Sequence, residues 1–313
     1  MKIGIVGAGQ VGATAAYAMT MRGVGSQIVL VDRKVDLAVA QAHDILDATP
    51  FAYPVRIRAG EAADLDAAGI VVLTAGASQK PGETRLDLLS RNTEIFAEII
   101  PAVLAAAPDT ILLVASNPVD IITQIVTVLA ARHGVAPERV IGSGTMLDSA
   151  RFRTLLAAHL GISPAYIDAR VLGEHGDSEV LHWSGAMVGD LSVADAARQL
   201  GREPGEADRR RIDAAVRRAA DAIIQGKGAT WFGVGAGLAR LAQVIQDDER
   251  ALITCSMSMA ECHGVRDVAL SLPRVLGARG VVTTFMPNLD AGECAALKRS
   301  VEILKQAAEE LRL

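Results

Sequence analysis

Two segments in the middle of the chain carry side chains that suit proton transfer beside a carboxylate. Asp148 and Arg151 are three residues apart, so they share one face if their segment is a helix. His175 stands in the segment Gly173–Ser178, where flanking glycines favour an exposed, tightly turned histidine over a buried one. Histidine moves a proton near neutral pH, a carboxylate orients its ring, and arginine grips a carboxylate bidentately. Beside a dinucleotide, these groups suit hydride transfer between a nicotinamide and a 2-oxo or 2-hydroxy acid.

A glycine-rich turn near the start of the chain predicts where that dinucleotide binds. The turn follows an apolar run at 2–6, opens a helical pattern, and contributes the candidate cofactor residues Gly7, Gly9, Gln10, Val11 and Gly12. Glycines permit a tight turn and close approach of the backbone to a pyrophosphate, and a helix N-terminus offers unpaired N–H groups. An ordinary strand-to-helix turn is the alternative, because the glycine pattern alone is a weak signal.

An acidic residue at the end of the second apolar run strengthens the dinucleotide interpretation. Asp32 comes 20 residues after Gly12, and its carboxylate can accept hydrogen bonds from the adenosine ribose. Because that carboxylate would repel a 2'-phosphate, NAD is favoured over NADP. Arg33 and Lys34 follow directly and are expected to be exposed loop charges.

Up to about residue 143, short apolar runs alternate with helical patterns. This alternation predicts an α/β fold, a Rossmann-type doubly wound parallel sheet with helices on both faces. The expected strands are 2–6, 27–31, 70–74, 111–115 and 140–141, and the expected helices are 10–22, 34–47, 84–107 and 118–131.

After residue 143 the pattern becomes α+β, which predicts a second, substrate-binding and catalytic domain. We therefore expect an NAD-binding domain at 1–143 and a substrate domain at 144–313. Asp290 is a plausible N-cap for the last helix. The expected helices are 146–159, 205–225, 231–247 and 290–311, and the expected strands are 166–172, 179–182, 252–258, 265–271 and 280–284.

Composition describes an ordinary globular protein of 313 residues, with 50% hydrophobic residues and a net charge of -5. This balance implies neither a nucleic-acid partner nor an anionic membrane surface, and the apolar stretches fall short of the ~20 residues of a bilayer span. The first residues lead straight into a strand without a signal-peptide pattern, so a cytoplasmic location is expected. Cys255, Cys262 and Cys294 form no CxxC pair and are expected to be small buried hydrophobes in a reducing compartment.

Several motifs in a fixed order resemble the lactate and malate dehydrogenase family over essentially the whole chain. Besides the glycine turn, they are Gly76–Leu86, Ser116–Asp120, Gly142–Arg153, Gly173–Ser178 and Gly226–Trp231. The resemblance implies that His175 is the acid–base residue, Asp148 its orienting partner, and Arg151 the clamp on the substrate carboxylate. It also implies that Arg85, on a closing loop, stabilises charge on the substrate carbonyl oxygen.

The same resemblance extends the candidate binding residues. Asn117 is expected to contact the nicotinamide ribose or substrate, although Asn-Pro is also a common turn signal. Further cofactor contacts are implied for Ala75, Gly76 and Ser143.

Charge at one position decides between the two substrates of the family. Gln79 is neutral where malate dehydrogenases usually have an arginine, and a second substrate carboxylate buried there without a partner would cost several kcal/mol. Thr230 matches the lactate-type pattern on the opposite wall. We therefore expect reversible NADH-dependent reduction of pyruvate to L-lactate, as used in glycolysis and fermentation.

Regulation, assembly and the rival functions follow from the same motifs. Many bacterial relatives bind fructose 1,6-bisphosphate through an arginine matching Arg153 and a histidine where this chain has Asp168. A carboxylate there repels phosphate and, if paired with Arg153, neutralises charge that the effector would bridge, so a weak response or none is expected. A homotetramer is expected from the family. The alternatives are a malate dehydrogenase, a catalytically silent NAD-binding redox sensor, and a zinc hydrolase using His175 and His182. The chain lacks a helical HExxH arrangement there, so no metal is expected.

Overall fold

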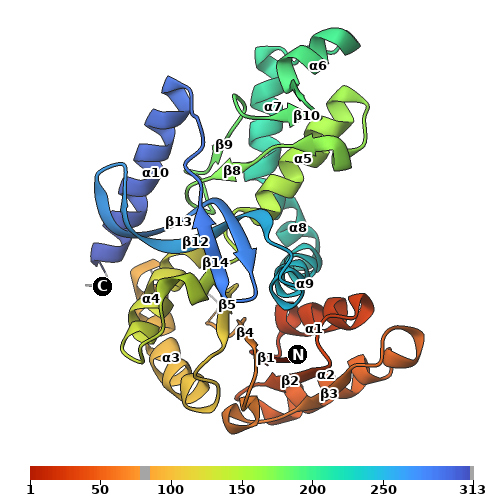
Figure 1. The fold of residues 1–313 in the computed structure, drawn as a ribbon, viewed down its shortest axis with the longest axis vertical. Helices are drawn as coiled ribbons and strands as arrows, with labels where there is room; N and C mark the ends of the chain where they lie inside the picture. The colour runs from red at the N-terminus through yellow and green to blue at the C-terminus, as the bar shows by residue number, and fades with distance from the viewer. Residues whose placement is uncertain (78–84, 311–313) are drawn as a thin grey trace.

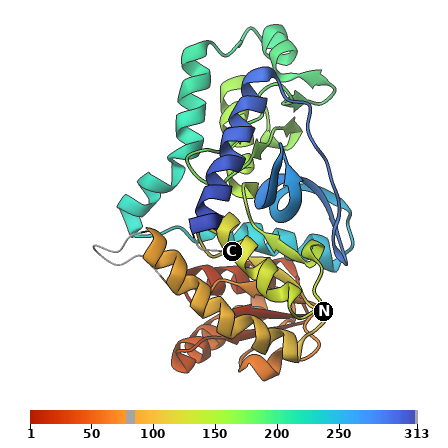
Figure 2. The ribbon, with the colours of Figure 1, turned by 90° about the vertical axis from the view of Figure 1, so that its left-hand side faces the viewer.

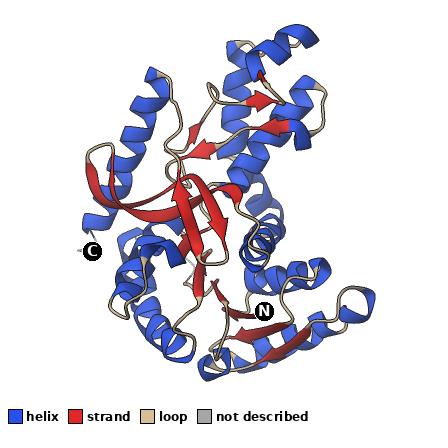
Figure 3. Cartoon of the chain, viewed as in Figure 1, coloured by secondary structure: helices blue, strands red, loops and turns tan. Residues whose placement is uncertain are grey.

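The computed structural model describes residues 1–77 and 85–310, and within them nine strands form one sheet (Figure 3). The strand order is β14-β13-β12-β6-β5-β4-β1-β2-β3. Six neighbouring strands run parallel: β1 (Lys2–Val6), β2 (Gln27–Val31), β3 (Arg56–Ala59), β4 (Ile70–Leu73), β5 (Ile111–Val114) and β6 (Val140–Gly142). Their order, 3-2-1-4-5-6, is that of the doubly wound dinucleotide-binding fold, so the predicted fold class is confirmed.

Helices cover both faces of the parallel strands, because the central strands β4 and β5 are apolar along their whole length. Every residue of β4, Ile-Val-Val-Leu, is buried, as a strand covered on both sides requires. One face carries α1 (Gln10–Arg22), α2 (Val35–Leu46) and α9 (Phe232–Gln246); the other carries α3 (Arg85–Ala106) and α4 (Val119–Ala131). Short 3-10 helices connect some of these elements: Thr49–Phe51, Ala62–Leu65 and Pro137–Arg139.

Elements from the second half of the sequence complete this layer. Strands β12 (Ala251–Cys262), β13 (Val265–Gly277) and β14 (Gly280–Thr284) extend the sheet in antiparallel fashion, joined to β6 at Ser256 and Gly142. Helix α9 lies against α1 so closely that a Cβ on Gly235 would come within 2.7 Å of Thr14. The two halves of the chain therefore share one sheet and one core.

The remaining elements form a lobe that lies mostly above the sheet in Figures 1 and 2, coloured from green to teal, with its last helix in blue. Its helices are α5 (Met146–Leu160), α6 (Val193–Leu200), α7 (Glu206–Arg217) and α8 (Ala219–Lys227), followed by α10 (Ala291–Glu310), which packs beside β13. Two small sheets pair β7 (Ile167–Asp168), β10 (Met187–Val188) and β11 (Leu191–Ser192), and β8 (Val171–Leu172) with β9 (Val180–Leu181). A 3-10 turn at Pro164–Tyr166 precedes β7.

Four points of the sequence-based prediction were wrong. Strand β3 was missed because its sequence, Arg-Ile-Arg-Ala, is charged at an exposed sheet edge. The single helix expected at 205–225 is two helices that meet at Arg218, and the strand expected at 166–172 is a turn and two short strands. Cys294 is exposed, whereas Cys255 and Cys262 are buried as expected.

One further expectation agrees with the structure. The N–H of Glu293 donates to Oδ1 of Asp290 over 2.8 Å, so Asp290 caps the start of α10. Among the described residues, no helix is long and apolar enough to cross a bilayer.

Candidate active site

A cavity of about 670 Å³ opens at the carboxyl ends of β1, β2 and β4, where the strand order reverses direction. Five predicted cofactor residues line it: Gly7, Gly9, Asp32, Ala75 and Gly76. The wall facing these residues is formed by α3 and was not indicated by the sequence. It includes Arg91, Glu94, Ile95, Glu98 and Ile99, and Thr74 and Ala77 also line the cavity. The position of α3 in the sequence gave part of the signal for these residues, because α3 directly follows the loop after β4. Arg33, expected as an exposed loop charge, is exposed and also lines the cavity.

The glycine turn leaves room for a ligand and packs tightly beneath it. A Cβ on Gly12 would lie 1.9 Å from the carbonyl oxygen of Gly7, so a side chain there would push α1 away from the turn. A Cβ on Gly9 would meet nothing within 4 Å and would instead fill the open cradle. This arrangement fits a pyrophosphate held against the backbone.

The start of α1 adds hydrogen-bond donors, because the first N–H groups of a helix have no acceptor within it. In the described structure no side chain caps this end, and Gln10, Val11 and Gly12 form the first turn. Asp32 is fixed beside it: its Oδ2 accepts from the N–H of Ala8 over 2.7 Å and its Oδ1 from Lys34 over 2.9 Å. The donors and the carboxylate are thus placed as an adenosine diphosphate group requires.

The other five predicted cofactor residues lie outside the lining of this cavity. Gln10, Val11 and Gly12 belong to the first turn of α1. Asn117 is exposed after β5, and Ser143 follows β6. The peptide bond between Asn117 and Pro118 is cis. Asn117 and Ser143 still sit at carboxyl ends of parallel strands, the edge of the sheet where this fold binds ligands.

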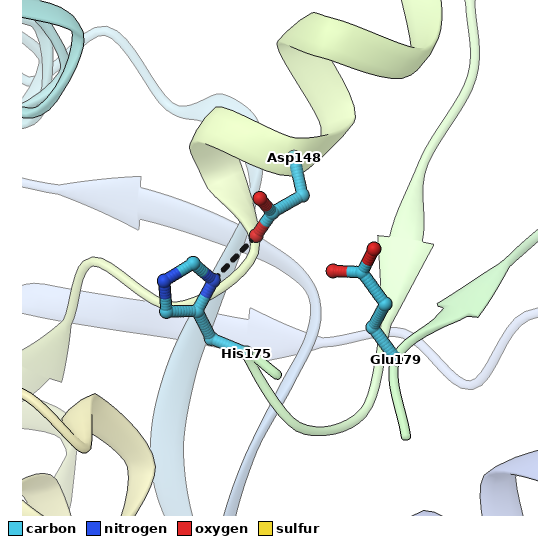
Figure 4. Close-up of side chains that lie close together, drawn as sticks. All are labelled: Asp148, His175 and Glu179. Atoms are coloured by element: carbon cyan, nitrogen blue, oxygen red, sulfur yellow. Dashed lines mark hydrogen bonds and ion pairs between the residues drawn. The ribbon is translucent and has the colours of Figure 1, made fainter. Parts of the chain in front are cut away.

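The predicted proton-transfer residues meet in one cluster, although they come from different elements. Asp148, 2% exposed in the first turn of α5, lies 2.6 Å from Nδ1 of His175 through its Oδ2 (Figure 4). Because a carboxylate only accepts, Nδ1–H is the donor, and Nε2 remains for a substrate. Arg151 donates from Nη1 to Oδ1 of the same carboxylate over 2.8 Å. The predicted three-residue spacing thus brings both side chains to one site.

A second buried carboxylate, missed by the sequence analysis, holds the backbone of His175. Oδ2 of Asp120 in α4 accepts from the N–H of His175 over 2.7 Å, and Asp120 is 2% exposed. Burial lowers the pKa of His175, but the hydrogen bond and charge of Asp148, then the charges of Asp120 and Glu179, raise it to about 9. Burial raises the pKa of Asp120 to about 6. The site therefore favours the imidazolium, the form that donates a proton.

The loop that carries His175 is also tied to α10. Ser300 accepts from the N–H of Glu174 over 2.8 Å, and the hydroxyl of Ser178 donates to Glu174 over 2.6 Å. Gly173, with φ +83°, leaves no room for a side chain, because a Cβ there would lie 2.6 Å from Oγ of Ser300. These contacts keep the turn tight, as its flanking glycines predicted, but the His175 side chain is partly buried, at 29% exposed, where an exposed one was expected.

Glu179 completes the cluster and gives it the spacing of a possible metal-ligand set. One ligand atom each of Asp148, His175 and Glu179 lies within 4.8 Å of the others. The Nδ1 atom of His175 is already engaged by Asp148, whose other oxygen is engaged by Arg151, which is the pattern of an acid–base pair. His182 points elsewhere, with Nε2 donating to the carbonyl of Asn288 over 2.9 Å. The zinc-hydrolase alternative pairing His175 with His182 therefore gains no support.

The remaining predicted residues divide between described and undescribed parts of the chain. Gln79 and the side chain of Arg85 lie outside the described residues, and Arg85 is the first residue of α3. Thr230 is half-buried in the turn between α8 and α9. The partner suggested for Asp168 was Arg153, whereas Oδ2 of Asp168 lies 2.7 Å from Arg170. Arg153, Asp168 and Arg170 line a separate cavity of about 220 Å³ beside the start of β12.

Comparison with known proteins agrees with this site and fold. Residues 1–142 match the model of the lactate/malate dehydrogenase NAD binding domain, and residues 145–312 match the alpha/beta C-terminal domain of the same family. The chain belongs to the lactate/malate dehydrogenase family. NAD as the cofactor and oxidoreductase chemistry on a 2-hydroxy acid, both predicted from the motifs, are thereby confirmed.

Individual relatives cover the chain almost completely. The chain is 54% identical to a protein named L-lactate dehydrogenase from Thermus aquaticus, over 99% of each chain, and 48% identical to one from Deinococcus radiodurans over 100% of each. The crystal structure of a minor L-lactate dehydrogenase from Enterococcus mundtii in a ligand-bound form superposes with a TM-score of 0.95, at 36% identity, over 100% of this chain and 98% of that one. A lactate dehydrogenase structure from a Medee basin deep-sea metagenome gives the same score and identity.

Proposed function

We propose that the chain is an L-lactate dehydrogenase that reduces pyruvate to L-lactate reversibly. The observation that carries the proposal is the pairing of Nδ1 of His175 with Asp148 at 2.6 Å, with Arg151 on the other oxygen of that carboxylate. It joins one proton donor and one carboxylate clamp at a single site. The relatives named above, L-lactate dehydrogenases at up to 54% identity, support the same reaction.

In the proposed reduction, His175 begins as the imidazolium. Nε2–H donates to the carbonyl oxygen of pyruvate, and the proton passes to that oxygen as the alcohol forms. Asp148 keeps Nδ1 protonated throughout and so fixes the ring orientation. In the reverse direction, neutral His175 takes the hydroxyl proton of lactate at Nε2.

Arg151 is proposed to bind the substrate carboxylate. Nη1 is held by Asp148, so the outer edge of the guanidinium, formed by its other donors, is free to make two parallel hydrogen bonds. Its side chain is 19% exposed, so part of the guanidinium remains accessible to a substrate. Arg85 is proposed on its motif to stabilise charge on the carbonyl oxygen.

The cofactor is proposed to bind along the glycine turn. The backbone at Gly9 and the N–H groups of the first turn of α1 would hold the pyrophosphate, Asp32 would bind the adenosine ribose, and Asn117 and Ser143 would contact the nicotinamide end. When bound, NADH supplies the hydride that reduces the carbonyl carbon.

Substrate choice is proposed on the charge of the pocket. Gln79 offers no cation to a second carboxylate, and Thr230 matches the lactate-type pattern for the opposite wall of the proposed pocket, so pyruvate is preferred over oxaloacetate. Malate dehydrogenase activity is the alternative within the family. A catalytically silent redox sensor would not need an acid–base pair and an arginine clamp in one cluster.

Three further features are proposed on family membership and motifs. They are a homotetramer, a cytoplasmic location, and a division near residue 143 into NAD-binding and substrate-binding parts. The pairing of Asp168 with Arg170 places a carboxylate beside Arg153, so we expect fructose 1,6-bisphosphate to have little effect.

Steady-state NADH oxidation with pyruvate, oxaloacetate and 2-oxobutyrate tests the proposal, each with and without fructose 1,6-bisphosphate. We expect the highest kcat/KM with pyruvate and an unchanged half-saturation concentration with the effector. A higher kcat/KM with oxaloacetate would favour the malate alternative, and failure with all three would favour the silent protein.

A further inference from the structure

The cluster contains one buried acid that the proposed reaction does not use. Glu179 precedes β9, is 3% exposed, and turns its carboxylate toward Asp148 and His175 (Figure 4). Its Oε1 atom is buried and has no hydrogen-bond partner among the described residues. An ionised carboxylate held in this way is costly, so its charge state must depend closely on its neighbours.

Those neighbours come from three packed segments and carry both signs of charge. Asp148 faces Glu179 from α5, and His175 faces it from the loop before β9, with atoms within 4.8 Å. From α7, the guanidinium of Arg217 also faces Glu179, but it is held by Asp213 through bonds of 2.8 and 3.1 Å and by the carbonyl of Asp177. The protonated ring of His175 is therefore the cation whose charge can change in step with Glu179.

We propose that Glu179 is a positioning residue whose negative charge stabilises the imidazolium of His175. Glu179 thereby extends, toward higher pH, the range in which the site holds its catalytic proton. This rests on the proposed function. As pH rises, Glu179 loses its proton first, and the new negative charge beside the ring favours the imidazolium. Pyruvate reduction then persists to a higher pH than Asp148 and Asp120 alone would allow.

Electrostatics supports this direction of coupling. Burial, followed by the charge of Asp148, raises the pKa of Glu179, while Arg217 and His175 lower it. Burial lowers the pKa of His175, and Asp148, Asp120 and Glu179 in turn raise it. The influence is mutual, as two interacting titratable groups require.

The test compares Glu179→Gln, which has the same shape and no charge, with Glu179→Asp and the unaltered protein. We expect the upper pH limb of kcat/KM for pyruvate to move down by roughly half a pH unit or more in Glu179→Gln. Glu179→Asp should restore most of the shift. Glu206→Gln, on an 83% exposed side chain, is the matched control and should leave the limb unchanged. An unshifted limb in Glu179→Gln would overturn the proposal.

A second readout does not depend on turnover. Diethyl pyrocarbonate reacts with neutral imidazole and not with imidazolium, so its rate at His175, followed by mass spectrometry against pH, reports the protonation of the ring directly. The midpoint should again be lower in Glu179→Gln. If the unaltered protein failed to reduce pyruvate while this shift appeared, the proposed function would fall and the charge coupling would stand.

Infrared difference spectroscopy covers the case in which Glu179→Gln does not fold. The unaltered protein should show a protonated carboxylic acid band near neutral pH that disappears at a lower pH than the one at which His175 becomes reactive. The band should shift in Glu179→Asp. Absence of any such band would overturn the proposal.

Discussion

The backbone N–H of His175 donates to Oδ2 of Asp120, 2.7 Å away, across 55 residues of sequence. This bond links the catalytic loop to α4, which begins directly after the Asn117–Pro118 turn at the end of β5. The ring of His175 is held by Asp148 of α5 and its backbone by Asp120 of α4. Two buried carboxylates therefore act on one imidazole from opposite parts of the fold.

Replacing Asp120 with asparagine should leave an acceptor for the His175 N–H but remove a buried charge. Because that charge favours the imidazolium, we expect the upper pH limb of kcat/KM for pyruvate to move down by roughly half a unit or more. The pH profile measures it. Thr127→Val, which removes a buried hydrogen bond on the same helix without changing charge, should keep the parental midpoint. Equal shifts in both variants would show a packing effect instead.

Replacing Asp148 with asparagine should be far more damaging to turnover. The asparagine cannot stabilise the imidazolium, and its NH2 group can present the wrong donor to Nδ1, so we expect kcat/KM for pyruvate to fall by about 100-fold or more. NADH binding, measured by fluorescence, should remain within a few-fold of the parental value, because Asp148 lies outside the cofactor cavity. Asp195→Asn, at an exposed ion pair, is the control. Near-parental turnover in Asp148→Asn would contradict the assigned role.

The two directions of the reaction should respond to pH with opposite signs. The pKa of His175 is raised to about 9, so the protonated ring needed for pyruvate reduction is lost as pH rises through that value. The neutral ring needed for lactate oxidation appears over the same interval. Initial rates in both directions between pH 6 and about 10 check this. Parallel profiles in the two directions would mean that another group carries the proton.

The glycine turn offers a matched pair of substitutions. Gly9→Ala adds a methyl group to open space, so we expect the parental melting temperature and at least roughly 10-fold weaker NADH binding. Gly12→Ala drives a Cβ to 1.9 Å from the Gly7 oxygen, so we expect a loss of about 1–3 kcal/mol of stability. Thermal unfolding and NADH titration of both variants separate the two effects. Tight NADH binding by Gly9→Ala would place the pyrophosphate elsewhere.

The sequence predicted the parallel part of the fold well because local patterns determine it. Strands such as β4 are continuous apolar runs that only a sheet covered on both faces can bury. The extension of the sheet by β12 was not predictable, since β12 joins β6 through a single bridge between Ser256 and Gly142. The packing of α9 on α1 likewise depends on a close approach at Gly235 that no periodicity reveals.

The candidate site divides in the same way. Short sequence patterns identified three of its residues: the spacing of Asp148 and Arg151, and the glycines around His175. Asp120 is the last residue of the Ser116–Asp120 motif, but its contact with His175 is set by the tertiary fold. Glu179 carried no signal, because an acid at a turn is ordinarily solvated and only the structure shows it buried.

The central claim is that His175 passes the proton in pyruvate reduction. The most direct measurement is single-turnover NADH oxidation with saturating pyruvate at pH 7, with the unaltered protein or His175→Gln in excess over NADH. We predict rapid turnover by the former and a loss of at least about 100-fold in the latter, with NADH affinity retained. Oxidation of NADH at the parental rate by His175→Gln would contradict the account.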